Sequence, residues 1–300
     1  MSLEMLVKEF LIDCQARNLS PKSISNYQKQ LGYFLRYLAE QHNVTTLEEL
    51  KHTHLKLYIL ALQEKGNKSQ YINDLIKPVK RLCSYALEEG YAEENVTKRV
   101  KNVKIEKTLI HTFSNDEIIK MIHYYDGNDY LSVRNRLILM ILFDTGIRVT
   151  ELVTLKKEQI RDGYFQIFGK GRKERVVPLS PLVLKHMLRY EAIKETYFFS
   201  RFPADYYFLS KNGKILTAEA VGKLMKVAAR KIGVSANVRV SPHTCRHTFA
   251  QKQLQNGLDL YSLSRLLGHE KVAITQRYLE SIQDSQILQA AKKTGVLANL

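Results

Sequence analysis

The spacing of apolar residues changes partway along this chain of 300 residues. Through roughly the first hundred residues, apolar side chains recur only at helical intervals, as in the stripe that contains Ile24, Leu31 and Leu38. Farther along, helical stretches alternate with short segments that have the two-residue period of strands. Because domains typically span roughly 100–200 residues, we predict a helical domain at residues 1–107 and a mixed domain at residues 108–300. The predicted fold class is mainly α with a small antiparallel β-sheet.

Terminal signals divide the first region into four helices. The chain begins with an amphipathic helix, and Ser20–Pro21 suits the N-cap and first position of the second. Two further helices are predicted at about 53–65 and 68–89. Each is followed by a glycine, which suits the left-handed position at a helix C-terminus. A compact four-helix unit is therefore expected.

Residues 95–112 are rich in Lys and Arg and carry no apolar stripe. This composition predicts an extended basic linker. Such a linker could cross a DNA backbone, although any solvated connector would look similar. The candidate DNA contacts in it are Lys98, Arg99, Lys101 and Lys104.

The second region mixes helices with a hairpin. Ser114 opens a helix that is predicted to reach about His123, and Arg148 begins another that is predicted to run to about Gln159. Strands at 164–168 and 175–179 flank a glycine-containing turn, which is typical of a β-hairpin. The other predicted elements are helices at about 130–144, 217–232, 244–256, 260–267 and 271–280, a strand at Tyr207–Leu209, and an amphipathic segment from Ile282 to about Leu297.

The charge of the chain is strongly positive and uneven. Lys and Arg number 46 against 30 Asp and Glu, for a formal net charge of +16. Residues 1–107 carry 17 basic and 13 acidic side chains, so most of the excess lies in the second region. A basic excess of this size favours nucleic acid or an anionic membrane surface as partner.

Other bulk features indicate a cytoplasmic protein without a membrane partner. No apolar run approaches the roughly 18 residues of a membrane span, and the N-terminus lacks the pattern of a signal peptide. Cys14, Cys83 and Cys245 are odd in number and widely spaced, so they fit reduced thiols better than a disulfide framework.

Six residues of the second region lie in local settings that suit contact with a phosphate. Arg148 begins a helix, where free backbone amides would add to its guanidinium, and Lys170 lies between two glycines at the hairpin tip. The others are His243, Arg246, His269 and Tyr278. Two guanidiniums, an ammonium, two imidazoles and a phenol are groups that could cleave a phosphodiester by nucleophilic attack without a metal.

Taken singly, these residues have plainer explanations. Lys170 fits an exposed turn, Arg148 with Glu151 fits a surface ion pair, and Tyr278 fits a packing residue in a chain with 17 tyrosines. The cluster His243, Cys245, His247 and His269 also raises the possibility of a zinc site. One thiol and an arginine among the ligands argue against zinc, and we expect neither a metal nor a cofactor.

The order and flanks of these residues resemble the tyrosine recombinase (phage integrase) family, in a compact Xer-like form. The resemblance extends over the whole chain and is carried by the segments 145–152, 169–179, 241–250 and 266–269. It implies that residues 1–107 form a helical core-binding domain that contacts DNA. Residues 108–300 would form the catalytic domain, with an exchange helix at its C-terminus.

The resemblance also implies a role for each residue. Tyr278 would attack the scissile phosphate to give a 3′-phosphotyrosyl link, with Arg148 and Arg246 on the non-bridging oxygens. His243 would accept the tyrosine proton and Lys170 would protonate the leaving 5′-oxygen. The remaining candidates are His269 at the phosphate, Glu151 in support, and Arg172 and Lys173 as DNA contacts.

The partners that this resemblance implies are double-stranded DNA and further recombinase subunits. A homo-tetramer, or a hetero-tetramer with a second recombinase, would act on two DNA sites through a Holliday junction, in association with the nucleoid. An accessory regulator and the biological role, chromosome dimer resolution or mobile-element integration and excision, stay open. The alternatives are a type IB topoisomerase-like enzyme that relaxes DNA and a non-catalytic DNA-binding protein on the same scaffold.

Overall fold

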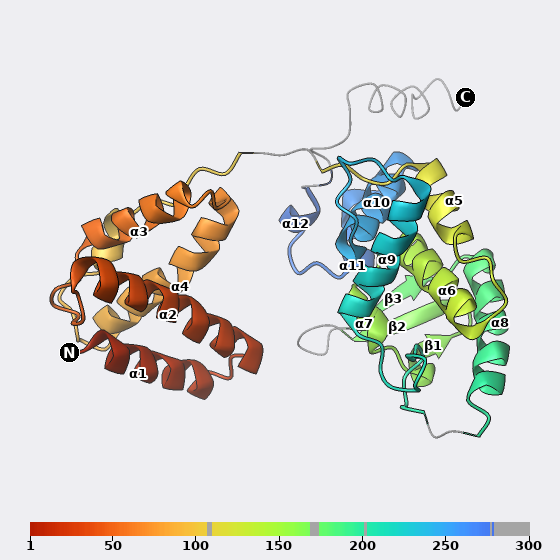
Figure 1. Cartoon of the computed structure of the whole chain (residues 1–300), viewed down its shortest axis with the longest axis horizontal. Coiled ribbons are helices and arrows are strands. Elements are labelled where there is room, and N and C mark those ends of the chain that lie inside the picture. Colours follow the sequence, from red (N-terminus) through yellow and green to blue (C-terminus); the bar gives the residue numbers. More distant parts are fainter. Residues whose placement is uncertain (107–109, 169–173, 201–202, 277, 279–300) are drawn as a thin grey trace. The chain divides into compact units, whose positions relative to one another are not determined.

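The computed structural model describes residues 1–106, 110–168, 174–200, 203–276 and 278 (Figure 1). The chain divides into two compact units, Met1–Thr108 and Leu109–Leu300. Each unit has its own hydrophobic core. Within the described ranges, no helix is long and apolar enough to cross a membrane.

The described part of the first unit holds four α-helices, at the predicted places. They are α1 (Leu3–Ala16), α2 (Pro21–His42), α3 (His52–Glu64) and α4 (Ser69–Glu88). The Ser20 hydroxyl accepts a hydrogen bond from the Ser23 amide and so caps α2, as predicted. Gly66 and Gly90, which follow α3 and α4, have φ angles of 72° and 75°. Terminal signals in the local sequence therefore locate these helices.

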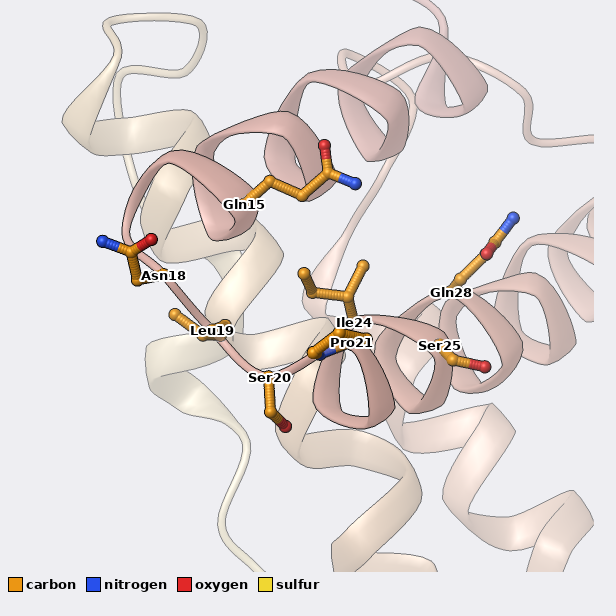
Figure 2. A pocket seen from close by; sticks show the side chains of 8 residues that line it. All are labelled: Gln15, Asn18, Leu19, Ser20, Pro21, Ile24, Ser25 and Gln28. Carbon is orange, nitrogen blue, oxygen red and sulfur yellow. The ribbon is translucent and has the colours of Figure 1, made fainter. Parts of the chain in front are cut away.

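The core of the first unit is apolar and lies between its helices. Leu6, Leu31 and Leu38 are among its fully buried side chains. Phe34 and Tyr58 bring α2 and α3 together, with ring centroids 5.1 Å apart. A shallow pocket of about 470 Å³ lies where α1 ends and α2 begins (Figure 2). Its lining offers amides and hydroxyls but no ionisable side chain, so we assign no chemistry to it.

The predicted linker is extended only in part. Its first residues form a 3₁₀ helix, η1 (Val96–Arg99), and Val100 is buried in the core of the first unit. The side chain of Asn73 makes two hydrogen bonds of 2.9 Å with the backbone of Val103. The expectation of a free extended segment from residue 95 is therefore wrong up to Val103, because buried apolar and amide contacts tie this stretch to α4.

The second unit is built around one helix that is buried on most sides. This is α6 (Tyr130–Thr145), which packs against α5 (Asn115–His123) and against three later helices. Ser114 and Glu117 form the capping box that starts α5. Gly146, with φ 60°, ends α6. The helices predicted at 114–123 and 130–144 are confirmed.

The sheet of the second unit is small and antiparallel, in the order β1-β2-β3. Its strands are β1 (Ile160–Arg161), β2 (Tyr164–Phe168) and β3 (Glu174–Pro178). The predicted hairpin corresponds to β2 and β3, whose register pairs Phe165 with Val177. Strand β1 was not predicted. Residues 169–173 at the hairpin tip lie outside the described residues, and these include Lys170, Arg172 and Lys173.

The helix that begins after Arg148 is much shorter than predicted. It is α7 (Val149–Val153), followed by the 3₁₀ helix η2 (Lys157–Gln159). Leu155 is fully buried, and its carbonyl accepts a hydrogen bond of 2.7 Å from the Tyr207 amide. Helix α7 therefore ends before Leu155, whose side chain is buried and whose carbonyl is hydrogen-bonded to Tyr207.

Two further differences concern the middle of the second unit. A helix that was not predicted, α8 (Pro181–Tyr197), packs along α6. The strand predicted at Tyr207–Leu209 is absent from the described secondary structure. There, Leu209 makes one isolated bridge with Ile215.

Four further helices are described in the second unit. They are α9 (Ala218–Ile232), α10 (Pro242–Gln255), α11 (Leu260–Leu267) and α12 (Ala273–Gln276). The first three agree with the predictions within two residues at each end, whereas α12 is shorter than the predicted 271–280. The predicted segment from Ile282 to Leu297 lies outside the described residues.

Candidate active site

Four segments of the second unit bring polar side chains together. They are the N-terminus of α7, helix α10, the turn after α11, and Tyr278 after α12; the helices are labelled in Figure 1. Arg148, Arg246, His269 and Tyr278 lie on them and are joined through shared hydrogen bonds and ring contacts. Residues that are 130 positions apart in the sequence therefore meet in one place.

Arg148 is held at the start of α7 by a carboxylate. Its Nη1 donates to Glu151 Oε1 at 2.9 Å, and its backbone amide donates to Glu151 Oε2 at 2.9 Å. Its Nη2 donates to the carbonyl of Gly268 at 3.0 Å. The side chain is 40% exposed, so the guanidinium is oriented and still accessible to a ligand.

Arg175 is a functional candidate that the sequence reasoning missed. From β3 it donates to both oxygens of Glu151, at 2.9 and 2.6 Å, and through Nε to the carbonyl of Leu266 at 3.0 Å. Its side chain is 9% exposed. Arg175 thus connects the sheet to the turn that carries His269. Its position in the segment 169–179, after Lys170, could have marked Arg175 as a candidate. Its partners Glu151 and Leu266 lie on other elements and could not be read from that segment.

The charge of Glu151 depends on the two arginines. Burial alone would raise the pKa of this carboxyl, but the hydrogen bonds and charge of Arg175, together with the hydrogen bonds from Arg148, hold the pKa below its usual range. A carboxylate placed between two guanidiniums fixes both of them. Glu151 therefore orients the site and does not face a ligand directly.

Gly268 is required at the turn after α11. Its φ is 66°, and a Cβ atom there would lie 2.9 Å from Cδ of Arg175. Its carbonyl accepts from Arg148, so the turn brings Arg148, Arg175 and His269 close together.

Arg246 is the buried arginine of the site. It is 3% exposed, and it donates to the carbonyls of Gly146 at 2.9 Å and Leu267 at 2.6 Å. Burial, together with the charge of Arg148, lowers its pKa to about 10, so it keeps its charge at neutral pH. A guanidinium has five N–H donors, and the described hydrogen bonds of Arg246 leave donors for an anion.

His269 lies against Arg246. Its Nε2 is 3.0 Å from Nη2 of Arg246, and its Nδ1 is 2.8 Å from Oγ1 of Thr275. Burial and the charges of Arg246 and Arg148 lower its pKa to about 4. The imidazole is therefore neutral at physiological pH in the DNA-free protein.

Tyr278 is packed in a small apolar cluster of its own. It is 4% exposed and lies with Phe249, Leu263 and Leu267. Its ring stacks on His269 with a centroid separation of 6.2 Å and meets His247 edge-on at 5.1 Å. The phenol is thus held beside two imidazoles and the buried guanidinium of Arg246.

The two histidines of α10 differ in exposure. Ser241 and Pro242 provide the N-cap and first residue of this helix. His243 is exposed in the first turn, whereas His247 is half-buried and stacks edge-on to His243 at 4.4 Å. The sequence favoured His243 over His247 as a proton acceptor, but of these two histidines it is His247 that has a described ring contact with Tyr278.

The remaining candidates are placed as follows. Lys98, Arg99, Lys101 and Lys104 are exposed on the first unit, and Arg99 forms an ion pair of 3.7 Å with Glu94. Lys170, Arg172 and Lys173 belong to the hairpin tip outside the described residues.

The four residues considered for zinc do not gather around one point. Cys245 is fully buried in the main core of the unit, where burial raises the pKa of its thiol well above its usual range. Nowhere in the described part of the chain do three or more His, Cys, Asp or Glu side chains form a cluster that could hold a metal.

The arrangement suits chemistry on a tetrahedral anion. Two oriented guanidiniums, a neutral imidazole and a phenol lie next to one another in the second unit. Donors of this kind stabilise charge that develops on phosphate oxygens, and a phenol can act as a nucleophile.

Comparison with known proteins agrees with this geometry. Residues 111–284 match the Phage integrase family, and residues 7–90 match the Phage integrase, N-terminal SAM-like domain. Tyrosine recombinase XerD of Staphylococcus aureus (strain Mu50 / ATCC 700699) is 30% identical over 290 residues, which cover 95% of this chain and 96% of that protein.

Two solved structures share the fold. XerH site-specific recombinase bound to palindromic difH substrate, a post-cleavage complex, has 23% identity and a TM-score of 0.74, covering 93% of this chain and 81% of that one. A lambda integrase tetramer bound to a Holliday junction has 17% identity and a TM-score of 0.73, covering 95% and 78%. The chain therefore belongs to the phage integrase family of tyrosine recombinases, enzymes that cleave and rejoin DNA at specific sites.

Proposed function

We propose that the chain recombines DNA through a covalent bond between Tyr278 and a 3′-phosphate. The observation that carries this proposal is the convergence of Arg148, Arg246 and His269 around Tyr278, from segments that are far apart in the sequence. The family membership of the chain and the named activity of its relatives support the same chemistry.

The first step is a displacement at phosphorus. The phenolic oxygen of Tyr278 forms a bond to phosphorus as the bond to the 5′-oxygen breaks, which leaves a 3′-phosphotyrosyl link and a 5′-hydroxyl. The phenolic proton passes to His243, and Lys170 gives a proton to the departing 5′-oxygen. General acid and base help of this kind contributes roughly 10²–10⁴-fold.

The second step repeats the first in reverse with another strand. The 5′-hydroxyl of a partner duplex attacks the phosphotyrosine and releases Tyr278. Because the covalent link keeps the energy of the phosphodiester, the residues present need no external energy source. Two such exchanges pass through a Holliday junction.

Arg148 and Arg246 hold the non-bridging oxygens in both steps. Their guanidiniums are oriented by Glu151 and by backbone carbonyls, so little reorganisation accompanies the reaction. Donors placed in this way stabilise the charge of the transition state. His269 would add a contact to the same phosphate, and Arg175 would keep Glu151 in place.

Double-stranded DNA would also contact exposed basic side chains of the first unit. Lys98, Arg99, Lys101 and Lys104 are all exposed, and Arg172 and Lys173 are proposed to join them. Each phosphate contact that is lost should reduce the slope of log affinity against log salt concentration by about one. Replacing Lys101 and Lys104 with Gln should therefore weaken binding to all sequences alike.

The assembly would be a tetramer on two DNA sites, made of this chain alone or with a second recombinase. The lambda integrase tetramer on a Holliday junction supports such an assembly. The segment from Ile282 to Leu297 is proposed to dock on a neighbouring subunit. The biological role would be chromosome dimer resolution or the integration and excision of a mobile element. The protein would act on DNA in the cytoplasm, and an accessory regulator could control when it acts.

Trapping covalent adducts on genomic DNA tests the proposal and finds the target site. Protein is mixed with DNA fragments, denatured, and the DNA that stays attached is sequenced. Wild-type protein and the control Tyr261→Phe, which alters an exposed tyrosine of α11, should attach to one recurring sequence. Tyr278→Phe should bind DNA without forming an adduct, and an adduct at wild-type level in this variant would remove Tyr278 as nucleophile.

Plasmid relaxation separates a recombinase from a relaxing enzyme. Supercoiled DNA without the recovered site should stay supercoiled, and two copies of the site should give recombinants. Relaxation of any plasmid without recombinants would favour the topoisomerase-like alternative.

A further inference from the structure

We infer that Thr275 is a positioning residue of the active site, which fixes the tautomer of His269 and ties it to the segment that carries Tyr278. The inference rests on the proposed function, since it concerns how His269 is presented to the phosphate. The structure provides three observations that carry it.

The first observation is the chemistry of the contact between His269 and Arg246. Arginine is a donor only, because all its nitrogen lone pairs are delocalised and its side chain stays protonated. The nitrogen of His269 that faces Nη2 of Arg246 at 3.0 Å must therefore accept. In a neutral imidazole, an accepting Nε2 requires the proton to lie on Nδ1.

The second observation is the partner of that Nδ1 proton. Oγ1 of Thr275 lies 2.8 Å from Nδ1 of His269 and must accept from it. Thr275 is fully buried, with 0% of its surface exposed. Water is therefore excluded at this point, and a buried N–H group without a partner would be costly.

The third observation is the place of Thr275 in the chain. Its backbone carbonyl accepts a hydrogen bond of 3.0 Å from the amide of Tyr278. One residue thus contacts His269 through its side chain and Tyr278 through its backbone. The series Tyr278, Thr275, His269 and Arg246 is continuous, from the nucleophile to the phosphate-binding guanidinium.

The contact of Thr275 with His269 links the position of Tyr278 to the state of the imidazole. If the segment carrying Tyr278 moves, Thr275 moves with it, and His269 loses the acceptor for its Nδ1 proton. The imidazole is then no longer held with Nε2 towards Arg246. Docking of the nucleophile and preparation of the phosphate site are coupled through one hydroxyl.

The variant Thr275→Val removes the hydroxyl and keeps the branched shape, and Thr275→Ser keeps the hydroxyl with less bulk. Histidine ¹⁵N spectra of the full-length protein without DNA report the tautomer directly, and His269→Gln identifies the His269 signals. Wild type and Thr275→Ser should show His269 protonated on Nδ1. In Thr275→Val, this single tautomer should give way to a mixture.

Cleavage is measured on the same variants, with the site recovered by adduct trapping. Thr275→Val should form the adduct on the order of ten to a hundred times more slowly, as when an orienting partner of an imidazole is lost, and Thr275→Ser should restore most of the rate. DNA affinity should not change. A protein that binds DNA but forms no adduct in its wild-type form would contradict the proposed function, while the spectra would still test the role of Thr275.

Three results would overturn the inference. One is a wild-type His269 protonated on Nε2. Another is a Thr275→Val protein whose His269 spectrum is unchanged. The third is a changed spectrum with an unchanged cleavage rate, which would make the contact structural only.

Discussion

The two units of this chain differ in what they bury. Among the described residues, the buried polar side chains of the first unit are Asn95 and Thr97, both at its end. Those of the second unit are Arg134, Thr145, Thr244, Arg246, Thr248, Gln251, Ser264 and Thr275. A buried polar group is costly unless it is hydrogen-bonded, so the second unit depends on internal hydrogen bonds such as those of Arg246 and Thr275, which also hold the site in place. The first unit needs only an apolar core and a basic surface.

The largest expected effect is the loss of the buried guanidinium. Arg246→Met would leave the carbonyls of Gly146 and Leu267 without their donors, at about 1–3 kcal/mol each. The second unit should lose roughly 3–5 kcal/mol, and cleavage should fall by about 10³-fold or more. Hydrogen exchange with mass spectrometry measures each unit separately.

The matched control for this variant is Arg36→Met in α2, where the side chain is exposed. It should leave the stability of the first unit within about 0.5 kcal/mol. Equal losses from the two variants would contradict the contrast between the units.

Next comes a pair of glycines with similar backbone angles. Gly146 and Gly66 have φ angles of 60° and 72°, but a Cβ on Gly146 would lie 2.5 Å from Cδ1 of Phe249, whereas one on Gly66 meets nothing within 4 Å. Gly66→Ala should cost about 1–2 kcal/mol from the left-handed conformation. Gly146→Ala should cost about 2–4 kcal/mol because crowding is added.

Phe249 also packs in the cluster of Tyr278, so Gly146→Ala should slow cleavage as well. Thermal unfolding and adduct formation would both be followed. If the two alanine variants have the same stability, the close packing around Gly146 is not as described.

A smaller effect is expected from the pair of Arg175 and Glu151. Arg175→Gln removes one partner of a carboxylate that is 12% exposed, and Arg148 keeps the other contact. We expect a loss of roughly 1–3 kcal/mol. In a double-mutant cycle with Glu151→Gln, the two changes should be non-additive; simple additivity would show that the pair does not act as a unit.

The smallest effect is a dependence of stability on pH that His269 causes. Its pKa is lowered to about 4 in the folded protein, from the 6.5 of a free side chain. The unfolded chain therefore binds the proton more strongly, and stability is lost as the pH falls from 6.5 towards 4. After allowing for solvent screening, the loss should be on the order of 1–2 kcal/mol.

The variant His269→Gln should lack this part of the pH dependence, and the difference between the two curves isolates His269. An identical slope for wild type and variant between pH 6.5 and 4 would contradict the buried, neutral imidazole. Glu151 acts in the same direction at lower pH, since its pKa is also lowered.

The same contrast explains how much of the fold could be predicted. The helices of the first unit follow from local signals such as Ser20, Gly66 and Gly90, which act within a few residues. Helix α8 has the same kind of start at Ser180–Pro181 and was overlooked, although this signal was available. The length of α7 could not be predicted from the local sequence, because Leu155 is buried and its carbonyl accepts a hydrogen bond from Tyr207, which lies far along the chain.

The site shows a similar division. The sequence sufficed to name Arg148, Arg246, His269 and Tyr278, because their order and the segments around them resemble a known family. Glu151, which orients Arg148 from three residues away, could be named as well, but Arg175 and Thr275 could not, because their partners come from other elements. Arg175 on β3 meets Glu151 on α7 only in the folded chain, and no pattern of spacing indicates such a contact.

We propose that Tyr278 becomes covalently linked to DNA in a site that buried polar groups hold in place. The direct test is mass spectrometry of the protease-digested adduct after nuclease treatment, which identifies the tyrosine that keeps a nucleotide. We expect one modified peptide, with the phosphodiester on Tyr278 and the 3′-end of the cleaved strand. A nucleotide on any other of the 17 tyrosines, or linkage through a 5′-phosphate, would contradict it.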